Sequence, residues 1–410
     1  MFVRMVDLPA SADVVIAGGA AIGSSVAYHL MTEPAFTGRV VVIEKDPTYR
    51  LSASALSAAS IRQQFSSVVN IRISLHGIRF LRDIALHLDV DGDAPEIGLK
   101  EGGYLYLASK AGADTLRRVH QLQRLEGADI AHLGRSELGT RFPWLNLEDV
   151  ACGNLGLSGE GWFDGWGLLQ AFRKKARALG AIYVTGDIAR YELDGERVAA
   201  VVLKDGSRIA CGTAVNAAGS QGARLAATAG VIIPVLAKKR YVYTFMCKGD
   251  VPDCPLLIDT SGVYCRPEGH RTADGQMFIC GASPPAHADP GWDEADAAVA
   301  DVDWTFFEDT VWPALATRVP AFEAIRTGQA WAGPYDMNIL DANAIVGPSS
   351  GVPNLHLANG FSGHGLQQSP AVGRGLAEMI AHGRYTSLDL SDLGHERIVH
   401  GRPLIEANVI

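Results

Sequence analysis

Three glycines and a carboxylate near the start of the chain have the types and spacing that suit the binding of a dinucleotide. An apolar run leads into Gly18, Gly19 and Gly23, and a second apolar run ends at Glu44. A helix that begins at Ala21 would direct its N–H groups and the positive end of its dipole at a pyrophosphate. A carboxylate at Glu44 accepts hydrogen bonds from ribose hydroxyls and repels a 2′-phosphate. The pattern predicts a site for NAD or FAD in preference to NADP.

The middle position of the usual G-x-G-x-x-G pattern is Ala20 in this chain. Its methyl group is expected to crowd the point where the backbone approaches a phosphate, because glycine normally allows that approach. The alternative interpretation of the run is an ordinary glycine-rich turn between a strand and a helix. Glu44 and the strand–helix–strand context favour the cofactor site over that alternative.

Composition restricts the classes of protein to which the chain can belong. The chain has 410 residues, 48% hydrophobic and 20% charged, so a globular protein with room for two domains is predicted. A formal net charge of −9 gives no reason to expect nucleic acid as a partner. The pattern predicts neither a membrane span nor a signal peptide. Six cysteines without a C-x-x-C pair predict reduced thiols, no metal site and a cytoplasmic location.

Hydrophobic patterning predicts alternating helices and strands, with a strand-rich texture between residues 234 and 331. The small-residue segment 51–60 is expected to be a loop that lets the backbone approach a ligand. The segment 211–219 is expected to be the last parallel strand of the cofactor sheet. The other expected elements are helices at 21–30, 69–88, 111–125 and 367–382, a helix that ends near residue 180, strands at 14–17, 40–44, 103–108, 181–185, 197–210 and 355–361, and a hairpin turn at 205–206.

Three separated segments resemble the FAD amine oxidoreductases, the superfamily of D-amino-acid oxidase, sarcosine oxidase and dimethylglycine dehydrogenase. They are the N-terminal turn with Glu44, the run Val215–Gly219 and the run Gly360–Gly365. Segments 55–65 and 360–368 look most like the group related to a mitochondrial protein of respiratory complex I assembly. The resemblance implies an α/β fold, α+β overall, in which a Rossmann-like FAD-binding domain is joined to a second, β-rich substrate domain. It implies FAD-binding segments at 1–92, 150–230 and 331–410 and substrate-domain segments at 93–149 and 231–330.

The resemblance also implies which residues contact FAD. The N-terminal turn and Glu44 would hold the ADP half, the Ile188 backbone would lie beside adenine, and Gly360–Gln367 would lie against the flavin ring. A glycine-rich turn that opens a helix presents N–H groups that stabilise negative charge on a reduced flavin. The expected cofactor-binding residues are Gly18, Gly19, Ala20, Ala21, Ile22, Gly23, Glu44, Lys45, Ser54, Ala59, Ser60, Ile188, Ala217, Ala218, Gly219, Gly333, Gly360, Phe361, Ser362, Gly363, His364, Gly365, Leu366 and Gln367.

Five residues are expected to act on the substrate: Arg62, Tyr264, Arg266, His364 and Gln367. The resemblance aligns Arg62 with the arginine that binds the substrate carboxylate in sarcosine oxidase, a task that suits the two parallel N–H groups of a guanidinium. Tyr264 and Arg266 are two apart on an expected strand and so share a face, and two cations would suit a substrate with two carboxylates. His364 is expected to contact or tune the flavin. Most of these residues have an alternative interpretation. Arg62 would lie on the surface, Tyr264 and Arg266 would lie on the half-exposed polar face of a strand, and His364 would bond only to the backbone.

Departures from the sarcosine oxidases lead to further expectations. Gln367 and Trp331 stand where those enzymes carry a lysine at the substrate and a cysteine that tethers the flavin, so FAD is expected to bind non-covalently. Ile279 stands where a lysine favours reaction with oxygen, unless His364 in its charged form or a lysine of the run 238–240 takes that place. The favoured electron acceptor is therefore a quinone or a carrier protein, with oxygen close behind. The run 238–240 itself is expected to be a solvated strand end.

Together these features predict a FAD-dependent amine oxidase or dehydrogenase. Its substrate would be a small, carboxylate-bearing secondary amine of the N-substituted glycine type, including dicarboxylic ones, and the imine product would hydrolyse to an oxo acid or aldehyde and an amine. One alternative is oxidation of a D-amino acid or a 2-hydroxy acid on the same scaffold. Another is an assembly or scaffold protein that holds FAD without turnover. An NAD dehydrogenase is disfavoured by the run Phe361–Gly365.

Overall fold

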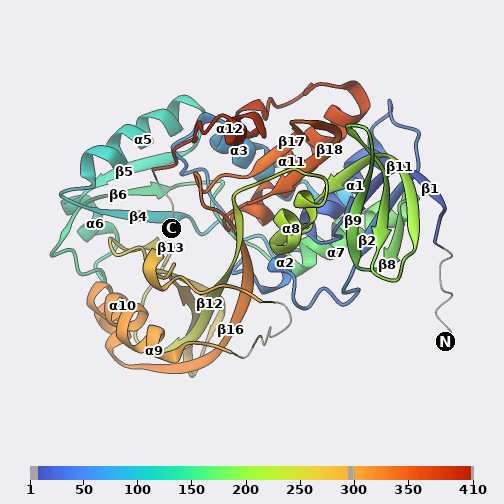
Figure 1. The fold of residues 1–410 in the computed structure, drawn as a ribbon. Helices are drawn as coiled ribbons and strands as arrows, with labels where there is room; N and C mark the ends of the chain where they lie inside the picture. The colour runs from blue at the N-terminus through green and yellow to red at the C-terminus, as the bar shows by residue number, and fades with distance from the viewer. Residues whose placement is uncertain (1–7, 294–298, 300, 408–410) are drawn as a thin grey trace.

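Two large β-sheets organise the part of the chain that the structure describes, residues 8–293, 299 and 301–407 (Figure 1). This computed structural model confirms the expected α/β fold with a second, strand-rich half. The helices that accompany the sheets are α1 (Ala21–Thr32), α2 (Ala53–Leu56), α3 (Val68–Arg82), α4 (Ile84–Leu88), α5 (Ala113–Leu125), α6 (Arg135–Arg141), α7 (Gly165–Ala178), α8 (Gly222–Ala227), α9 (Trp304–Phe306), α10 (Trp312–Arg318), α11 (Gly365–His382) and α12 (Glu396–Val399).

The first sheet is mostly parallel, because helices return the chain across its faces between strands. β1 pairs in parallel with β2 on one side and with β11 on the other, and β11 pairs in parallel with β18. The prediction that β11 is the last parallel strand is therefore wrong. The spatial order is β17 (Ile345–Ser349), β18 (Val352–Asn359), β11 (Arg208–Asn216), β1 (Ser11–Ala17), β2 (Val40–Glu44) and β8 (Ile182–Thr185), and β10 (Arg197–Leu203) and β9 (Ile188–Asp194) extend antiparallel from β11.

Both faces of the first sheet are buried. Val14 and Ile16 pack with helices α1, α7 and α11, whereas Val15 and Ala17 pack with β10 and α8 on the opposite face. Each fully buried valine or isoleucine contributes about 1.5–3 kcal/mol of hydrophobic stabilisation. Helices α1 and α11 cross closely, and the Ser25 hydroxyl donates to the Ser369 carbonyl at 2.7 Å. This packing fixes the N-terminal ends of α1 and α11 relative to the strand ends.

The second sheet is mostly antiparallel and has an aromatic core (Figure 1, left side). Phe245 and Phe278 stack with their ring centroids 5.3 Å apart, and Phe322 meets both rings edge-on. The spatial order is β16 (Ile325–Asn338), β12 (Val235–Cys247), β15 (Gly275–Gly281), β14 (Tyr264–Thr272), β13 (Leu256–Ile258), β4 (Tyr104–Ser109), β6 (Val150–Gly156) and β5 (Ile130–Gly134).

Strand pairing conflicts with two of the expected segment boundaries. β6 pairs with β4 and β5, so residues 150–156 belong to the second sheet although they were expected in the cofactor half. The expected boundary between residues 330 and 331 falls inside β16, which pairs with β12 along its length. Long-range pairing decides these positions, and no local composition change marks them in the sequence.

Three local expectations also need correction. The segment 51–60 contains the short helix α2 and the start of β3 (Ser60–Ile61), which pairs with β7 (Gly161–Trp162). The expected helix 69–88 is divided at Asp83 into α3 and α4. The run 238–240 lies inside β12, and its three side chains are only 15–18% exposed.

Candidate cofactor and substrate site

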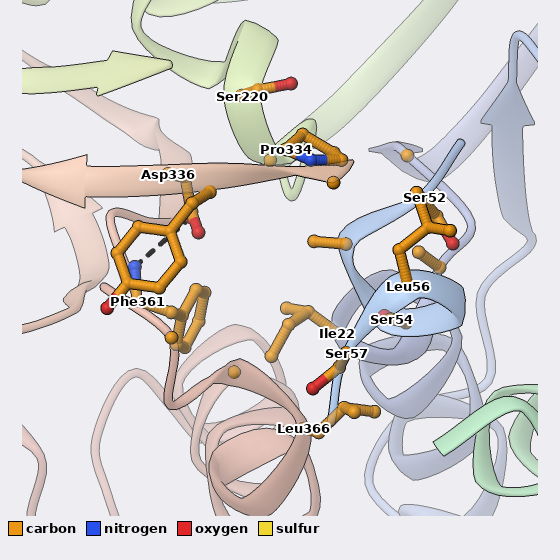
Figure 2. A pocket seen from close by; sticks show the side chains of 18 of the residues that line it. Ile22, Ser52, Ser54, Leu56, Ser57, Ser220, Pro334, Asp336, Phe361 and Leu366 are labelled. Carbon is orange, nitrogen blue, oxygen red and sulfur yellow. Dashed lines mark hydrogen bonds between the residues drawn. The ribbon is translucent and has the colours of Figure 1, made fainter. Parts of the chain in front are cut away.

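A cavity of about 870 Å³ is lined by residues of both sheets. It is at the upper end of the range of about 300–1,000 Å³ that is typical of ligand sites. At one end it meets the carboxyl ends of β1 and β2, where open α/β sheets bind their ligands. Side chains of α1, α2, β16 and the turn before α11 surround its middle part (Figure 2). A site of this length suits a dinucleotide together with a small second molecule.

The glycines of the N-terminal turn are required by close backbone contacts. Gly18 has a φ of +93°, and a Cβ added to it would lie 2.4 Å from the Ala217 carbonyl oxygen. A Cβ added to Gly23 would lie 1.9 Å from the Gly18 carbonyl oxygen, so α1 packs directly on the turn. Ala20 has a φ of −69° and lines the cavity. The backbone at position 20 therefore does not need glycine, and only the space available to a phosphate decides the effect of its methyl group.

The carboxylate of Glu44 lies at the end of β2, where it was expected to bind ribose. Its Oε2 accepts from the Gly19 N–H at 2.8 Å and its Oε1 accepts from the Asp46 N–H at 2.9 Å. Burial raises the pKa of Glu44, and the two N–H groups oppose that rise. Each carboxylate oxygen has a second lone pair, so both can still accept from ribose hydroxyls. The donor and acceptor groups at this end of the cavity fit the ADP half of FAD.

The segment 51–60 forms one wall beside the middle of the cavity. The Ser54 hydroxyl accepts from the Ala21 N–H at 3.3 Å, and Leu56 lies so close to Gly333 that an added Cβ there would be 2.9 Å from the Leu56 Cβ. The indole N–H of Trp331 donates to the Leu56 carbonyl at 2.8 Å, and Trp331 is not a lining residue. Residues 333–336 line the cavity in its place. None of the six cysteines lines the described cavity, and non-covalent binding of the cofactor stays a prediction.

The turn 360–365 is held by a carboxylate that the sequence analysis missed. Asp336 Oδ2 accepts from the Gly360 N–H at 2.8 Å. It also accepts from the Phe361 N–H at 3.1 Å (Figure 2). Burial raises the pKa of Asp336 to about 6. A Cβ added to Gly363, whose φ is +85°, would lie 2.7 Å from the Tyr335 ring. The turn thus leads into α11, whose first turn has no acidic residue and no side-chain cap, with its positive end toward the cavity.

Arg62 is a buried residue at the cavity wall, so the surface alternative is wrong. Its side chain is 1% exposed, and its guanidinium lies 4.0 Å from the centroid of the Phe65 ring. Nη1 donates to the Gln64 carbonyl at 2.5 Å, and Nη2 lies 2.9 Å from His364 Nε2. The Arg62 backbone N–H donates to Gln367 Oε1 at 2.9 Å. Three of the expected substrate residues, Arg62, His364 and Gln367, are therefore brought together from positions about 300 apart in the chain.

His364 is a neutral histidine in this arrangement. Burial, together with the Arg62 charge, lowers the pKa of His364 to about 3. Arginine has no acceptor, so His364 Nε2 must accept from Arg62 Nη2, and Nδ1 carries the proton toward the Phe361 carbonyl. The expectation that a charged His364 could replace the oxygen-activating lysine is therefore wrong.

A buried carboxylate supports the Arg62 loop from behind. Glu160 is fully buried, and its Oε1 accepts from the N–H groups of Gln63 and Gln64. Its Oε2 accepts from Gln64 Nε2 at 2.8 Å. Burial raises the pKa of Glu160 to about 7, although these donors and the Arg62 charge oppose the rise. Glu160 was not predicted as a site residue, because it lies 96 positions from Gln64 and belongs to no recognisable motif.

Tyr264 and Arg266 have different surroundings despite their shared strand face. Tyr264 lines the cavity. The Arg266 guanidinium donates to the Ala58 carbonyl at 2.7 Å and pairs with Glu268, and Arg266 does not line the cavity. The structure therefore corrects the expectation that Arg266 points into the pocket.

Two further expectations about cations change. Ile279 is buried and does not line the cavity, so it is not the residue that faces a flavin. Lys239 pairs with Asp301 at 2.7 Å, and Lys238 lies 3.5 Å from Asp289. Arg240, which was expected in solvent, lines the cavity.

Most of the expected cofactor and substrate residues meet at this one cavity. Gly19, Ala21, Gly23, Gly360 and Arg266 do not line it, although the first four hold the turns that do. The expected residues that line it are Gly18, Ala20, Ile22, Glu44, Lys45, Ser54, Ala59, Ser60, Arg62, Ile188, Ala217, Ala218, Gly219, Tyr264, Gly333, Phe361, Ser362, Gly363, His364, Gly365, Leu366 and Gln367.

The described residues contain neither a membrane-spanning helix nor a cluster of metal-binding side chains. Within 8–293, 299 and 301–407, no helix has the length and apolar character needed to cross a membrane. In the same ranges, no group of three or more histidine, cysteine, aspartate or glutamate side chains could hold a metal ion.

The known proteins to which this chain is similar are FAD-dependent enzymes and their relatives. The family described as FAD dependent oxidoreductase (DAO) matches residues 13–379. FAD-dependent oxidoreductase domain-containing protein 1 of Xenopus laevis is 41% identical to this chain over 435 residues, which cover 98% of this chain and 85% of that protein. Mitochondrial sarcosine dehydrogenase of Mus musculus is 26% identical, over 96% of this chain and 43% of that protein.

The fold is shared with a solved structure as well. L-proline dehydrogenase from P. horikoshii superposes with a TM-score of 0.78 at 23% identity, over 97% of this chain and 100% of that one. The N-terminal turn, Glu44 and the turn 360–365 fit a FAD molecule that extends through the cavity. With a family match along most of its length and a relative at 41% identity, this chain belongs to the DAO family of FAD-dependent oxidoreductases.

Proposed function

We propose that this protein oxidises the C–N bond of a small, carboxylate-bearing secondary amine. The observation that carries the proposal is the buried guanidinium of Arg62 at the cavity wall, beside the turn 360–367. An arginine buried in that place suits an anionic group that must be held in a fixed orientation. FAD, when bound, supplies the group that accepts a hydride from the substrate carbon next to nitrogen.

The residues of the chain would bind and orient the substrate. Arg62 binds the carboxylate, and the Gln367 amide, whose oxygen accepts from the Arg62 backbone N–H, keeps the Arg62 loop against the turn. Neutral His364 accepts from Arg62 and leaves the guanidinium as the charge that attracts the carboxylate. The nitrogen lone pair forms the C=N bond as the hydride leaves, the N–H proton passes to water, and water then adds to the imine to release an oxo acid or aldehyde and an amine.

Anaerobic titration tests the proposal. The FAD-loaded protein is mixed with N-methyl amino acids, D-amino acids and 2-hydroxy acids while the absorbance of oxidised flavin is followed. We expect the N-methyl amino acids to reduce the flavin fastest. Faster reduction by D-amino acids or 2-hydroxy acids would contradict the proposed substrate class, and no reduction by any compound would leave an assembly or scaffold protein as the function.

We also propose that the electron acceptor is a quinone or a carrier protein and that the protein acts in the cytoplasm. The neutral state of His364, and the pairing of Lys238 and Lys239 with Asp289 and Asp301, favour slow reaction with oxygen. Stopped-flow mixing of substrate-reduced protein with air-saturated buffer measures this directly. Reoxidation as fast as turnover, with peroxide formed in equal amount, would identify an oxidase.

A further inference from the structure

A second guanidinium lines the cavity and has no role in the chemistry proposed above. Arg240 lies on β12 opposite Gly333 of β16, and its side chain is 15% exposed. Its guanidinium packs on Tyr335, 4.5 Å from the ring centroid. Asp289 accepts from Nη1 at 2.5 Å and from Nη2 at 3.3 Å. The Nε atom is buried and has no hydrogen-bond partner among the described residues.

Two cations lie beside one carboxylate behind this wall. Lys238 lies 3.5 Å from the same Asp289 carboxylate, so two cations share one half-buried anion. Asp336 also lines the cavity, and its Oδ2 is already engaged by two backbone N–H groups. Asp293 also lines the cavity, from an exposed position. Because arginine stays protonated in proteins, Arg240 keeps a fixed positive charge at the cavity wall.

Arg240 and Arg62 border the same part of the cavity. The Tyr335 hydroxyl, next to Arg240, donates to the Ser362 carbonyl, and two residues further along the turn His364 bonds to Arg62. Burial raises the pKa of Tyr335 to about 12, and the charges of both arginines oppose that rise. The two guanidinium groups therefore act on one hydroxyl, and a small molecule in front of the turn 362–364 is within the field of both.

We propose that Arg240 binds a second acidic group of the substrate, so that the preferred substrate is a dicarboxylic secondary amine with one carboxylate at Arg62 and the other at Arg240. This inference rests on the proposed function. Arg240 takes the role that the sequence suggested for Arg266, whose guanidinium is engaged by the Ala58 carbonyl and Glu268 and does not line the cavity. A fixed guanidinium charge at the wall of a ligand cavity favours a carboxylate in front of it.

The test compares an acid with its amide. N-methylaspartate and N-methylasparagine have nearly the same shape and differ in the distal charge, as do thiodiacetate and its monoamide, which are not amines. Anaerobic flavin reduction is measured with the first pair and equilibrium binding to the FAD-loaded protein, by calorimetry, with the second. We expect the wild-type protein to prefer each acid over its amide by about 10- to 100-fold, as a charge-assisted hydrogen bond implies.

Two variants assign the preference to Arg240. Arg240→Met should reduce the acid-to-amide ratio to near 1 in both measurements, and Arg240→Lys should retain part of it. Arg266→Met is the matched control, because it also removes an acid-paired arginine from the second sheet, but one whose side chain does not line the cavity. It should keep the wild-type ratio.

The outcomes separate this inference from the proposed function. Equal binding of acid and amide by the wild-type protein, or the same loss of preference in Arg266→Met, overturns the role of Arg240 while amine oxidation still stands. Preference for thiodiacetate that depends on Arg240, without flavin reduction by any amine, supports the anion site and overturns the proposed function instead.

Discussion

The Glu160→Gln variant should be less stable than the wild-type protein at low pH and more stable than it at high pH. Burial raises the pKa of Glu160 from an ordinary 4.5 to about 7. Because the pKa in the folded state is above that in the unfolded state, this group's contribution is fully present below pH 4.5 and is lost as the pH rises through 7. At about 1.4 kcal/mol for each pKa unit, the wild-type protein should lose about 2–3 kcal/mol of unfolding free energy between pH 5 and pH 8 through this carboxyl alone.

The glutamine variant lacks that pH dependence. Its Oε1 can still accept from the Gln63 and Gln64 N–H groups, but its amide nitrogen would face Gln64 Nε2. Rotation of the Gln64 amide, whose oxygen has no partner in the described structure, would restore that bond and release the Tyr104 carbonyl. One lost hydrogen bond costs about 1 kcal/mol. The variant should therefore be less stable than the wild-type protein at pH 5 and more stable at pH 8.

Urea unfolding at pH 5, 6, 7 and 8, with FAD in constant excess, measures the difference. Glu101→Gln is the control, because Arg82 lowers the pKa of Glu101. Its stabilising contribution is present at high pH and is lost as the pH falls, so its variant should differ from the wild-type protein most at high pH. Parallel pH profiles for Glu160→Gln and the wild-type protein would refute the assignment of a buried, neutralisable carboxyl behind Arg62.

Three further predictions concern the cofactor and the substrate anchor. Arg62→Met should leave the flavin spectrum unchanged and weaken substrate binding by about 2–5 kcal/mol, because the substrate carboxylate is left without its charged partner. Arg62→Lys should recover part of that loss. Kinetics equal to wild type in Arg62→Met would remove the proposed anchor. Acid precipitation should release the flavin into the supernatant, and colour that stays with the pellet would mean a covalent bond. Ala20→Gly should tighten FAD binding by up to about 1 kcal/mol, measured by fluorescence titration, if the methyl group crowds the pyrophosphate; weaker binding would show that the loss of backbone rigidity outweighs the space gained.

The two turns that bind the cofactor could be predicted because local sequence determines them. Gly18 needs a positive φ, Gly23 must touch the turn, and Glu44 must follow the second strand, so the type and spacing of these residues carry the information. The turn 360–365 is predictable for the same reason. Arg62 was assigned by resemblance, and its burial then followed from the structure.

Contacts between distant segments decided the rest of the site. Asp336 and Glu160 bind backbone N–H groups that lie 24 and 96–97 positions away, and nothing near either residue in the sequence marks that partner. Arg240 and Arg266 were both visible as arginines on strands, and the sequence favoured the wrong one for the cavity. Strand periodicity determines which face a side chain occupies, but the neighbours at that face come from other parts of the chain. The sequence by itself determined the cofactor turns, and only the tertiary structure decided which charged groups surround the substrate, because charge and burial depend on what the fold brings alongside each side chain.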